Sequence, residues 1–558
     1  MVLIAATLFL CLGLLNLDFS RGWWAGQRRR LLIGVPIVIL VVYEQMPALV
    51  FPQALVLLLY TFIPNAAYSL WEGLRTAVIA RRVVSIHRTP LRPYLYVVGG
   101  LLAFAALLQM LPVVNAGGLR DIVHVTVTDA KPPTAPLKHL RIVPAESALF
   151  AGDKVVGQLG AYYEVGNFNI QVENGRLVWV APLEFRDAIK WFLRRTSPGV
   201  IVVSAENPNA SAEVRQRGAL RFIPSALLND NLFRHVYMRY GFEQILEQTL
   251  QLDDHGNPQY LVTLGRPTIG WSGQRVTGVV IVDPVTGDMR RIAAADFSTL
   301  PSWVSRVVPP DLALAYNSWF GRYVHGWWNA HLGERDVHLP ARDEVFGLIA
   351  GEKFVWFVDH SSPSASDQSM TGFTYMDTVS GSMTYYTASG GEFSSQGAER
   401  AVASNPTVRQ GKLLPTQPIL SNLFGQNTWI VPLVADSGKY QSLSLVQATN
   451  GHVTVGNVNS GTPEVDALEA YRAFLGAGPE RARGEAAATS GTLERVASLG
   501  NGVYFTLHGV HRIYRVEDPA GPQALLARPG DRVTFTAIAP DAQGNWTARN
   551  LVDMTLQK

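Results

Sequence analysis

The chain has one cysteine, Cys11, which lies inside an apolar run. A disulfide within the chain is therefore impossible, and a metal site built on several cysteines is excluded. Residues 1–114 lack lysine and hold nine arginines against three acidic residues, a balance of +6. The remainder holds 47 − 9 = 38 basic and 44 − 3 = 41 acidic residues, a balance of −3. Without a basic excess there, nucleic acid is disfavoured as a partner.

Motifs for catalysis are also scarce. The run Asp359-His360-Ser361 contains the residue types of a hydrolase triad, but consecutive strand residues point to opposite faces and cannot form one relay. Three histidines are spaced too widely for one metal-binding helix face: His325, His331 and His338. The sequence therefore predicts no catalytic residue, no cofactor and no metal site.

What the chain does have is long apolar runs near its start, at 1–17, about 31–46, about 48–70 and about 95–114. A helix needs about 20 apolar residues to cross a bilayer, so residues 1–114 predict a four-helix transmembrane domain. The first run is expected to be retained rather than cleaved, because no basic residue precedes it.

The arginines predict the orientation of these helices. One basic loop precedes the middle pair of runs and another, from Arg75 to Arg92, follows it. Because basic loops prefer the cytoplasmic side, the N-terminus and everything after residue 114 are expected outside the cell membrane. Glu44 then falls at the outer turn in contact with water, although an intramembrane functional acid is the alternative.

The outer region predicts an α+β organisation. Two of its segments have helical spacing: 185–195, with Ile189, Trp191, Phe192 and Leu193 mostly on one side, and 232–252. The expected divisions are a linker or stalk at 115–138, a first α+β module at 139–230, and further α+β modules at 231–345 and 346–478.

Two segments of this region are alike, TGVVIVDPVTGDM at 277–289 and TGFTYMDTVSGSM at 371–383. Asp283 and Gly287 in the first match Asp377 and Gly381 in the second. A weaker third copy spans 443–458 and contains Gly451. Asp accepts backbone hydrogen bonds in turns and Gly supplies positive φ, so these residues predict a repeated structural turn rather than a repeated active site.

These units resemble the strand–turn–strand of PepSY domains, which often carries a V-D-x-x-T-G-x-[VIM] run. The matching residues are Val282, Asp283, Thr286, Gly287 and Met289, then Met376, Asp377, Ser380, Gly381 and Met383. The third copy has Gln447 in place of the Asp. The resemblance implies extracytoplasmic modules that bind or restrain partners rather than catalyse reactions.

The last part of the chain predicts an all-β barrel. A linker is expected at 479–490, and 491–558 contains five short strands separated by turns. Five such strands resemble an OB-fold barrel, with an SH3-like barrel as the alternative. Its candidate contact residues are Tyr504, Tyr514 and Trp546. Tyr504 and Phe505 are adjacent on a strand, so at least one of them is expected in the core.

A dense aromatic cluster lies at 316–333 and comprises Trp319, Phe320, Tyr323, Trp327 and Trp328. Aromatic side chains are favoured in cores, at membrane surfaces and at subunit contacts, and the sequence leaves all three open.

Together these features predict a membrane-anchored, extracytoplasmic binding or assembly scaffold of a cell-envelope complex. Its partners would be the lipid bilayer and other envelope proteins or further copies of itself, in a homo-oligomer. One alternative is an envelope enzyme whose site is assembled from distant residues. Another is a subunit of a multimeric channel or transporter, with Glu44 or Asn16 on a water-filled axis.

Overall fold

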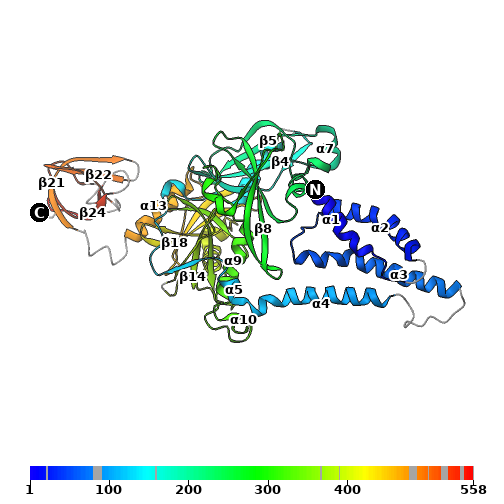
Figure 1. Cartoon of the computed structure of the whole chain (residues 1–558). Helices are drawn as coiled ribbons and strands as arrows, with labels where there is room; N and C mark the ends of the chain where they lie inside the picture. The colour runs from blue at the N-terminus through cyan, green and yellow to red at the C-terminus, as the bar shows by residue number, and fades with distance from the viewer. Residues whose placement is uncertain are drawn as a thin grey trace. The chain divides into compact units, whose positions relative to one another are not determined.

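The computed structural model describes residues 1–19, 23–79, 91–157, 160–364, 367–388, 390–476, 487–499, 502–516, 526–540 and 546–556. The chain divides into two compact units, Met1–Ala467 and Leu468–Lys558. Within these described residues, the first unit contains a helical part and four β-sheets, and the second contains a closed β-barrel (Figure 1).

The helical part consists of α1 (Val2–Cys11), η1 (Leu12–Leu14), α2 (Trp23–Gln45), η2 (Gln53–Leu58), α3 (Leu59–Ile79) and α4 (Arg92–Val114). Among the described residues, two helical segments are long and apolar enough to cross a membrane, Gln53–Glu72 and Arg92–Val114.

The prediction of four transmembrane helices was therefore wrong, and the fold is a mixed α/β arrangement of many sheets with two candidate spans. The apolar helix Val2–Leu14 is only about 20 Å long, which is short of a hydrocarbon core of about 30 Å. Helix α2 has three consecutive arginines near its start, Arg28, Arg29 and Arg30, so its apolar stretch covers only the part of the helix after them.

Four mainly antiparallel sheets follow in the described residues, and we call them modules A to D. Module A contains β2 (Tyr163–Val165), β3 (Asn169–Glu173), β4 (Arg176–Phe185), β5 (Ser197–Ser204) and β6 (Glu213–Leu220), and module B contains β7 (Gln244–Leu252), β8 (Pro258–Ile269), β9 (Ser272–Val282) and β10 (Met289–Ala293). Module C contains β11 (Leu339–Pro340), β12 (Phe346–Ala350), β13 (Lys353–Ser361), β14 (Gly372–Asp377) and β15 (Met383–Thr387). Module D contains β16 (Leu414–Pro415), β17 (Ile419–Leu423), β18 (Gln426–Val434), β19 (Tyr440–Gln447) and β20 (Val453–Val455).

Helices precede each sheet in the chain. They are α6 (Ala145–Val156) before module A, α8 (Leu232–Tyr240) before B, α9 (Pro310–Arg322) and α10 (Gly326–Trp328) before C, and α11 (Ser395–Ser404) and α12 (Pro406–Gln410) before D. Helix α7 (Ala188–Arg194) is inserted between β4 and β5, and α13 (Pro463–Gly476) follows module D.

The sheets of modules A and C are buried on both faces. In β4, Leu177 and Trp179 pack with module C, whereas the alternate residues Val178 and Val180 pack with module B. In β13, Trp356 likewise faces module A, and its neighbours in sequence pack with module D. Alternate side chains of a strand point to opposite faces, so burial on both sides explains the near-continuous apolar runs of these strands.

Two segments differ from their predicted helices. The pattern at 232–252 predicted one helix, but α8 ends at Tyr240 and β7 begins at Gln244. Gly241 terminates the helix, and the alternating apolar residues beyond it join a sheet. The helix predicted at 185–195 forms as α7, but Trp191 is buried while Ile189, Phe192 and Leu193 are exposed.

The predicted linker 115–138 contacts the modules. It contains α5 (Ala116–Arg120) and β1 (Val125–Thr128), and β1 pairs in parallel with β15. The Ala135 amide donates to the Asn422 carbonyl at 3.0 Å, and the Asn422 side chain donates to the Pro132 carbonyl at 3.0 Å. These contacts extend the sheet of module C and reach module D.

The three similar turns share one hydrogen-bonding pattern. The amide of Gly287 donates to the Asp283 carbonyl, that of Gly381 to Asp377 and that of Gly451 to Gln447, each at 2.9 Å. All three glycines have positive φ, from 69° to 82°. The Asp283 and Asp377 carboxylates each accept two further backbone amides. The Asp carboxylate and the positive φ of the Gly thus serve the turn itself.

The second unit contains a closed barrel of β21 (Ala487–Leu499), β22 (Gly502–Leu507), β23 (Val510–Val516), β24 (Arg532–Pro540) and β25 (Trp546–Asp553). The strand order around the barrel is β21-β22-β23-β25-β24, and β23 pairs in parallel with β25. Strand β21 pairs with β22 near its end and with β24 near its start, which closes the barrel. Of the expected linker at 479–490, residues 479–486 lie outside the described residues.

A candidate binding pocket between two β modules

A short segment, Arg followed by two apolar residues and Pro, recurs just before the helices of modules A, B and C. It comprises 141–144, 221–224 and 306–309. In modules A and C, the arginine of this segment lies over a buried tryptophan of the following sheet. The Arg141 guanidinium is 5.0 Å from the Trp179 ring centre, and that of Arg306 is 5.1 Å from the Trp356 ring centre.

The same tryptophans hold the backbone of the segment. The Trp179 indole N–H donates to the Val143 carbonyl at 2.9 Å, and the Trp356 indole N–H donates to the Val308 carbonyl at 2.8 Å. Module D has the indole bond without the arginine, since Trp429 donates to the Phe393 carbonyl at 2.9 Å. Each indole thus satisfies its only polar atom while its ring is buried, as buried tryptophans require.

The two arginine–tryptophan pairs of modules A and C line one pocket of about 330 Å³. Arg141, Arg306, Trp179 and Trp356 are all at most 6% exposed. Three acidic residues with exposed side chains also line the pocket: Asp311, Asp343 and Glu344. The pocket therefore combines buried guanidinium and aromatic groups with carboxylates that reach solvent.

The two guanidinium groups have different partners. Arg306 forms an ion pair with Glu247 and donates to the Thr249 hydroxyl at 3.0 Å. Arg141 donates to the Gln417 side-chain oxygen and, at 3.5 Å, to the Gly347 carbonyl. No ion pair of Arg141 occurs within the described part of the chain.

Burial lowers the pKa of Arg141 to about 10, against the attraction of Glu146 and Glu344, which raises it. Arg141 is therefore still charged at neutral pH, and its hydrogen-bond acceptors carry no formal charge. A buried cation of this kind gains from an anion that enters the pocket, because ion pairing is strongest where water is excluded.

A second buried polar group lies where α9 meets β13. Asn317 donates its side-chain N–H to the Ala313 carbonyl at 2.8 Å, so its oxygen faces the His360 Nε2, 2.9 Å away. His360 Nε2–H therefore donates, which leaves His360 Nδ1 to accept from His338 Nδ1–H at 2.9 Å. Burial lowers the pKa of His338 to about 4 and holds that of His360 well below its usual value.

The neighbour of His360 in sequence points the other way. The Asp359 carboxylate accepts the backbone amide of Ser395 at 2.7 Å, at the start of α11. Burial raises the pKa of Asp359. Asp359 and His360 thus serve different helices, and the described residues hold no group of three or more His, Cys, Asp or Glu side chains able to bind a metal.

The helical part has its own buried polar contacts. Arg30 Nε donates to Asn65 Oδ1 at 2.9 Å, and an Arg30 terminal nitrogen donates to the Ser69 hydroxyl at 2.7 Å. Asn16, proposed for the axis of a channel, is 5% exposed and its backbone amide donates to Gln27. Glu44 is exposed at the end of α2. Asn16 therefore faces neighbouring helices.

The structure separates the predicted aromatic cluster. Phe320 belongs to the core shared by modules A and C, and Trp319 packs against that core. Tyr323 follows α9 and is half-buried. Trp327 stacks on His331 at 4.2 Å between ring centres, whereas Trp328 is 68% exposed. One part of the cluster is core and the other lies at the surface near α10.

The predicted barrel residues also differ from one another. Tyr514 is 2% exposed and stacks on Phe505 in the barrel core. Tyr504 is half-buried, with the Arg515 guanidinium 6.0 Å from its ring centre. Trp546 packs against the core, and the Arg512 guanidinium lies 4.3 Å from the Trp546 ring centre.

The pocket was not predicted from the sequence. Its signal was the repeated Arg-apolar-apolar-Pro segment, which precedes a tryptophan-bearing strand in modules A and C. The pairing of Arg141 with Gln417, which are far apart in the chain, could not be read from any local pattern.

The chain matches no protein-family model, and no curated protein matches it. Among solved structures it is similar to an exo-1,5-α-L-arabinanase from a bovine ruminal metagenomic library, with 12% identity over 60% of this chain and 93% of that chain and a TM-score of 0.16. It is also similar to a GH43_1 enzyme from Xanthomonas citri, with 12% identity over 54% of this chain and 96% of that chain and a TM-score of 0.17. At these TM-scores neither similarity carries an argument about this chain.

Proposed function

We propose that this protein is a membrane-anchored scaffold that binds or assembles partners at the cell envelope, with its β modules and barrel outside the membrane. The observation that carries the proposal is that both ends of the two-helix segment contact module B or the helix α8 that precedes it. Before the first candidate span, the Tyr237 hydroxyl donates to the Pro47 carbonyl at 2.9 Å. Near the end of the second, Leu108 lies against Gly270 in the β8–β9 turn.

These contacts support a hairpin whose two spans return the chain to the side of the modules. The connection between the spans, residues 73–91, contains Arg75, Arg81, Arg82 and Arg88. Because basic connections favour the cytoplasmic side, the modules would lie on the opposite side.

The assembly role is supported by repetition. Each module is a sheet with terminal strands such as β6 and β10, and such strands can pair with further chains. The PepSY-like turns and the OB-like strand order of the barrel, with its parallel β23–β25 pair, are consistent with binding modules. In this proposal the partners are envelope proteins or other copies of the chain.

Two measurements test the proposal. Proteases added to intact cells should remove the barrel, while a tag near residue 80 should be labelled only after the cells are opened. Native extraction and mass measurement should give a complex larger than one chain. A protected barrel would refute the orientation, and a lone monomer with no co-purifying chain would refute the assembly role.

A second candidate function, recognition of a small carboxylate by the pocket, is favoured by the uncharged partners of Arg141. Benzoate is a suitable probe because it joins a carboxylate to an aromatic ring. Saturation-transfer NMR should show benzoate binding that Arg141→Gln abolishes and Lys138→Gln, an exposed change nearby in the chain, leaves intact. Equal binding by both variants would contradict this role.

A further inference from the structure

Helix α7 presents an apolar surface to its surroundings. Ile189 is 67% exposed, Phe192 54% and Leu193 64%. Trp191 between them is fully buried in the core shared by modules A and B. The buried tryptophan anchors the helix, and the three apolar side chains on its other side lack a covering element in the described part of the chain.

Basic side chains surround this surface. Arg186, Lys190, Arg194 and Arg195 lie in or next to α7. The acidic residue among them, Asp187, accepts the Lys190 backbone amide at 2.9 Å and so caps the helix start. An apolar face edged by several cations is the composition of helices that lie in a membrane interface.

Helix α7 also lies near the membrane-spanning part. Trp191 packs in the same core as Leu232 and Val236 of α8. Helix α8 in turn contacts the last turn of α2, where Arg234 donates to the Tyr43 carbonyl at 3.2 Å. Figure 1 shows α7 at the side of the β modules where α1 begins.

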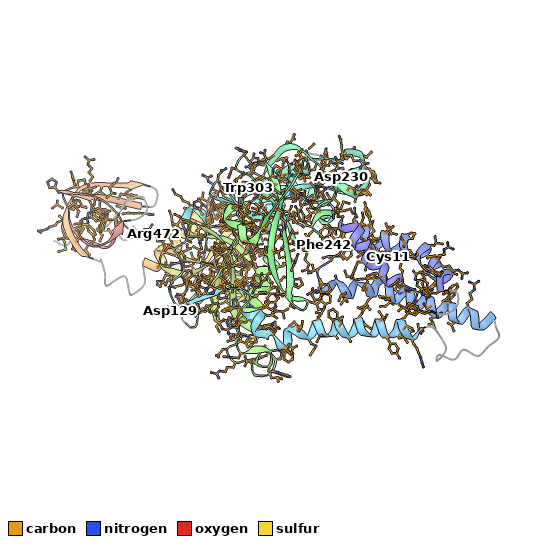
Figure 2. All side chains as sticks on the ribbon, in the orientation of Figure 1. Cys11, Asp129, Asp230, Phe242, Trp303 and Arg472 are labelled. Atoms are coloured by element: carbon orange, nitrogen blue, oxygen red, sulfur yellow. The ribbon has the colours of Figure 1, made fainter. Side chains whose placement is uncertain are left out.

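A further exposed aromatic residue lies on this side. Phe242 is 47% exposed. It follows Gly241, whose carbonyl accepts a hydrogen bond from the Leu49 amide at 2.8 Å. Figure 2 labels Phe242 and, in the adjacent helical part, Cys11. The side of the modules that meets the helices thus exposes apolar groups from two elements.

We propose that α7 inserts its apolar face into the bilayer leaflet next to the β modules. Ile189, Phe192 and Leu193 contact the acyl chains, and Lys190 and Arg194 bind the phosphates of anionic lipids. This contact fixes the tilt of the modules over the membrane. This inference about α7 rests on the proposal that Gln53–Glu72 and Arg92–Val114 span that membrane.

The test uses the full chain in lipid nanodiscs. Because Cys11 is the only cysteine, Cys11→Ser permits one fluorescent label at a chosen site. Phe192→Cys reports on α7, Leu107→Cys on the half of α4 nearer the modules, and Leu414→Cys on module D. The last two positions are 58% and 48% exposed, so each accepts a label.

Lipids with brominated acyl chains quench a label that touches the hydrocarbon. We expect about twofold quenching at 107 and 192 and almost none at 414. Absent quenching at 107 would refute the spanning helices themselves. Quenching at 107 without quenching at 192 would overturn the α7 inference alone. A label at 192 that reports an apolar site without bromine quenching would overturn it as well, since protein would then cover the helix.

A charge variant tests the lipid headgroup contact. Lys190→Gln combined with Arg194→Gln should reduce quenching at 192 in discs containing phosphatidylglycerol more than in discs of phosphatidylcholine alone. An equal reduction in both lipids would refute the role of anionic phosphates.

Discussion

Acid should loosen the contact between α9 and β13, because the His338–His360 pair is buried in neutral form. An unfolded histidine titrates near pH 6.5, whereas burial lowers the pKa of His338 to about 4. Between these values the unfolded chain binds a proton that the folded chain does not. The contribution of His338 is therefore complete above pH 6.5, is lost as the pH falls, and is gone below about 4.

The size of this loss follows from the shift. A difference of about 2.5 units corresponds to about 3 kcal/mol at pH 4, and the loss is about 2 kcal/mol by pH 5. His360 adds to it in the same direction, since its pKa is also lowered.

The variant His338→Gln isolates this effect. Its amide N–H can still donate to His360 Nδ1, but glutamine does not titrate. The variant loses the ring packing on Tyr385, so it should be less stable at pH 7.5. From pH 7.5 to 5, however, its free energy of opening should fall by about 2 kcal/mol less than that of the unmodified protein.

Hydrogen exchange measured by mass spectrometry on peptides of β13 and β14 gives these opening energies after correction for intrinsic exchange rates. His331→Gln is the matched control, because His331 is exposed. The control should keep the full acid dependence. An equal loss of opening energy in His338→Gln and the unmodified protein would refute the assignment of a neutral, buried His338.

Three further changes test the repeated modules by urea unfolding of the detergent-solubilised protein. Gln447→Asp should stabilise module D by about 0.5–1 kcal/mol by supplying the turn acceptor that Asp377 supplies in module C, and a loss of stability would contradict the shared turn. Trp356→Phe should cost about 2 kcal/mol because it leaves the Val308 carbonyl without its buried donor, and a neutral effect would show that water replaces the indole. Gly287→Ala should cost about 1–2 kcal/mol because φ there is 82°, and full stability would mean that the turn can change conformation.

Local patterns predicted the parts of the fold whose cause is local. The turns at Asp283 and Asp377 follow from short-range hydrogen bonds and positive φ at glycine. Helix α7 could be predicted from its spacing, but not which of its sides is buried. That choice depends on Trp191 fitting the core between modules A and B.

The prediction of four transmembrane helices was wrong because it used only the length of the apolar runs. The runs at 1–17 and 31–46 are apolar, yet Val2–Leu14 is short and α2 contains Arg28–Arg30. Arg30 is buried because Asn65 and Ser69, from another helix, accept its hydrogen bonds. A hydropathy pattern does not contain such partners.

The order of residues along the chain determined the turns at Asp283 and Asp377, the apolar runs near its start, and the charge difference between the N-terminal part and the rest. Tertiary structure alone decided that β21 pairs with β24, that His338 meets His360, and that Arg141 donates to Gln417. Turns and helices arise from interactions over a few residues. The pocket and the histidine pair arise from packing of segments distant in the chain, where the burial of one group depends on the shape of another.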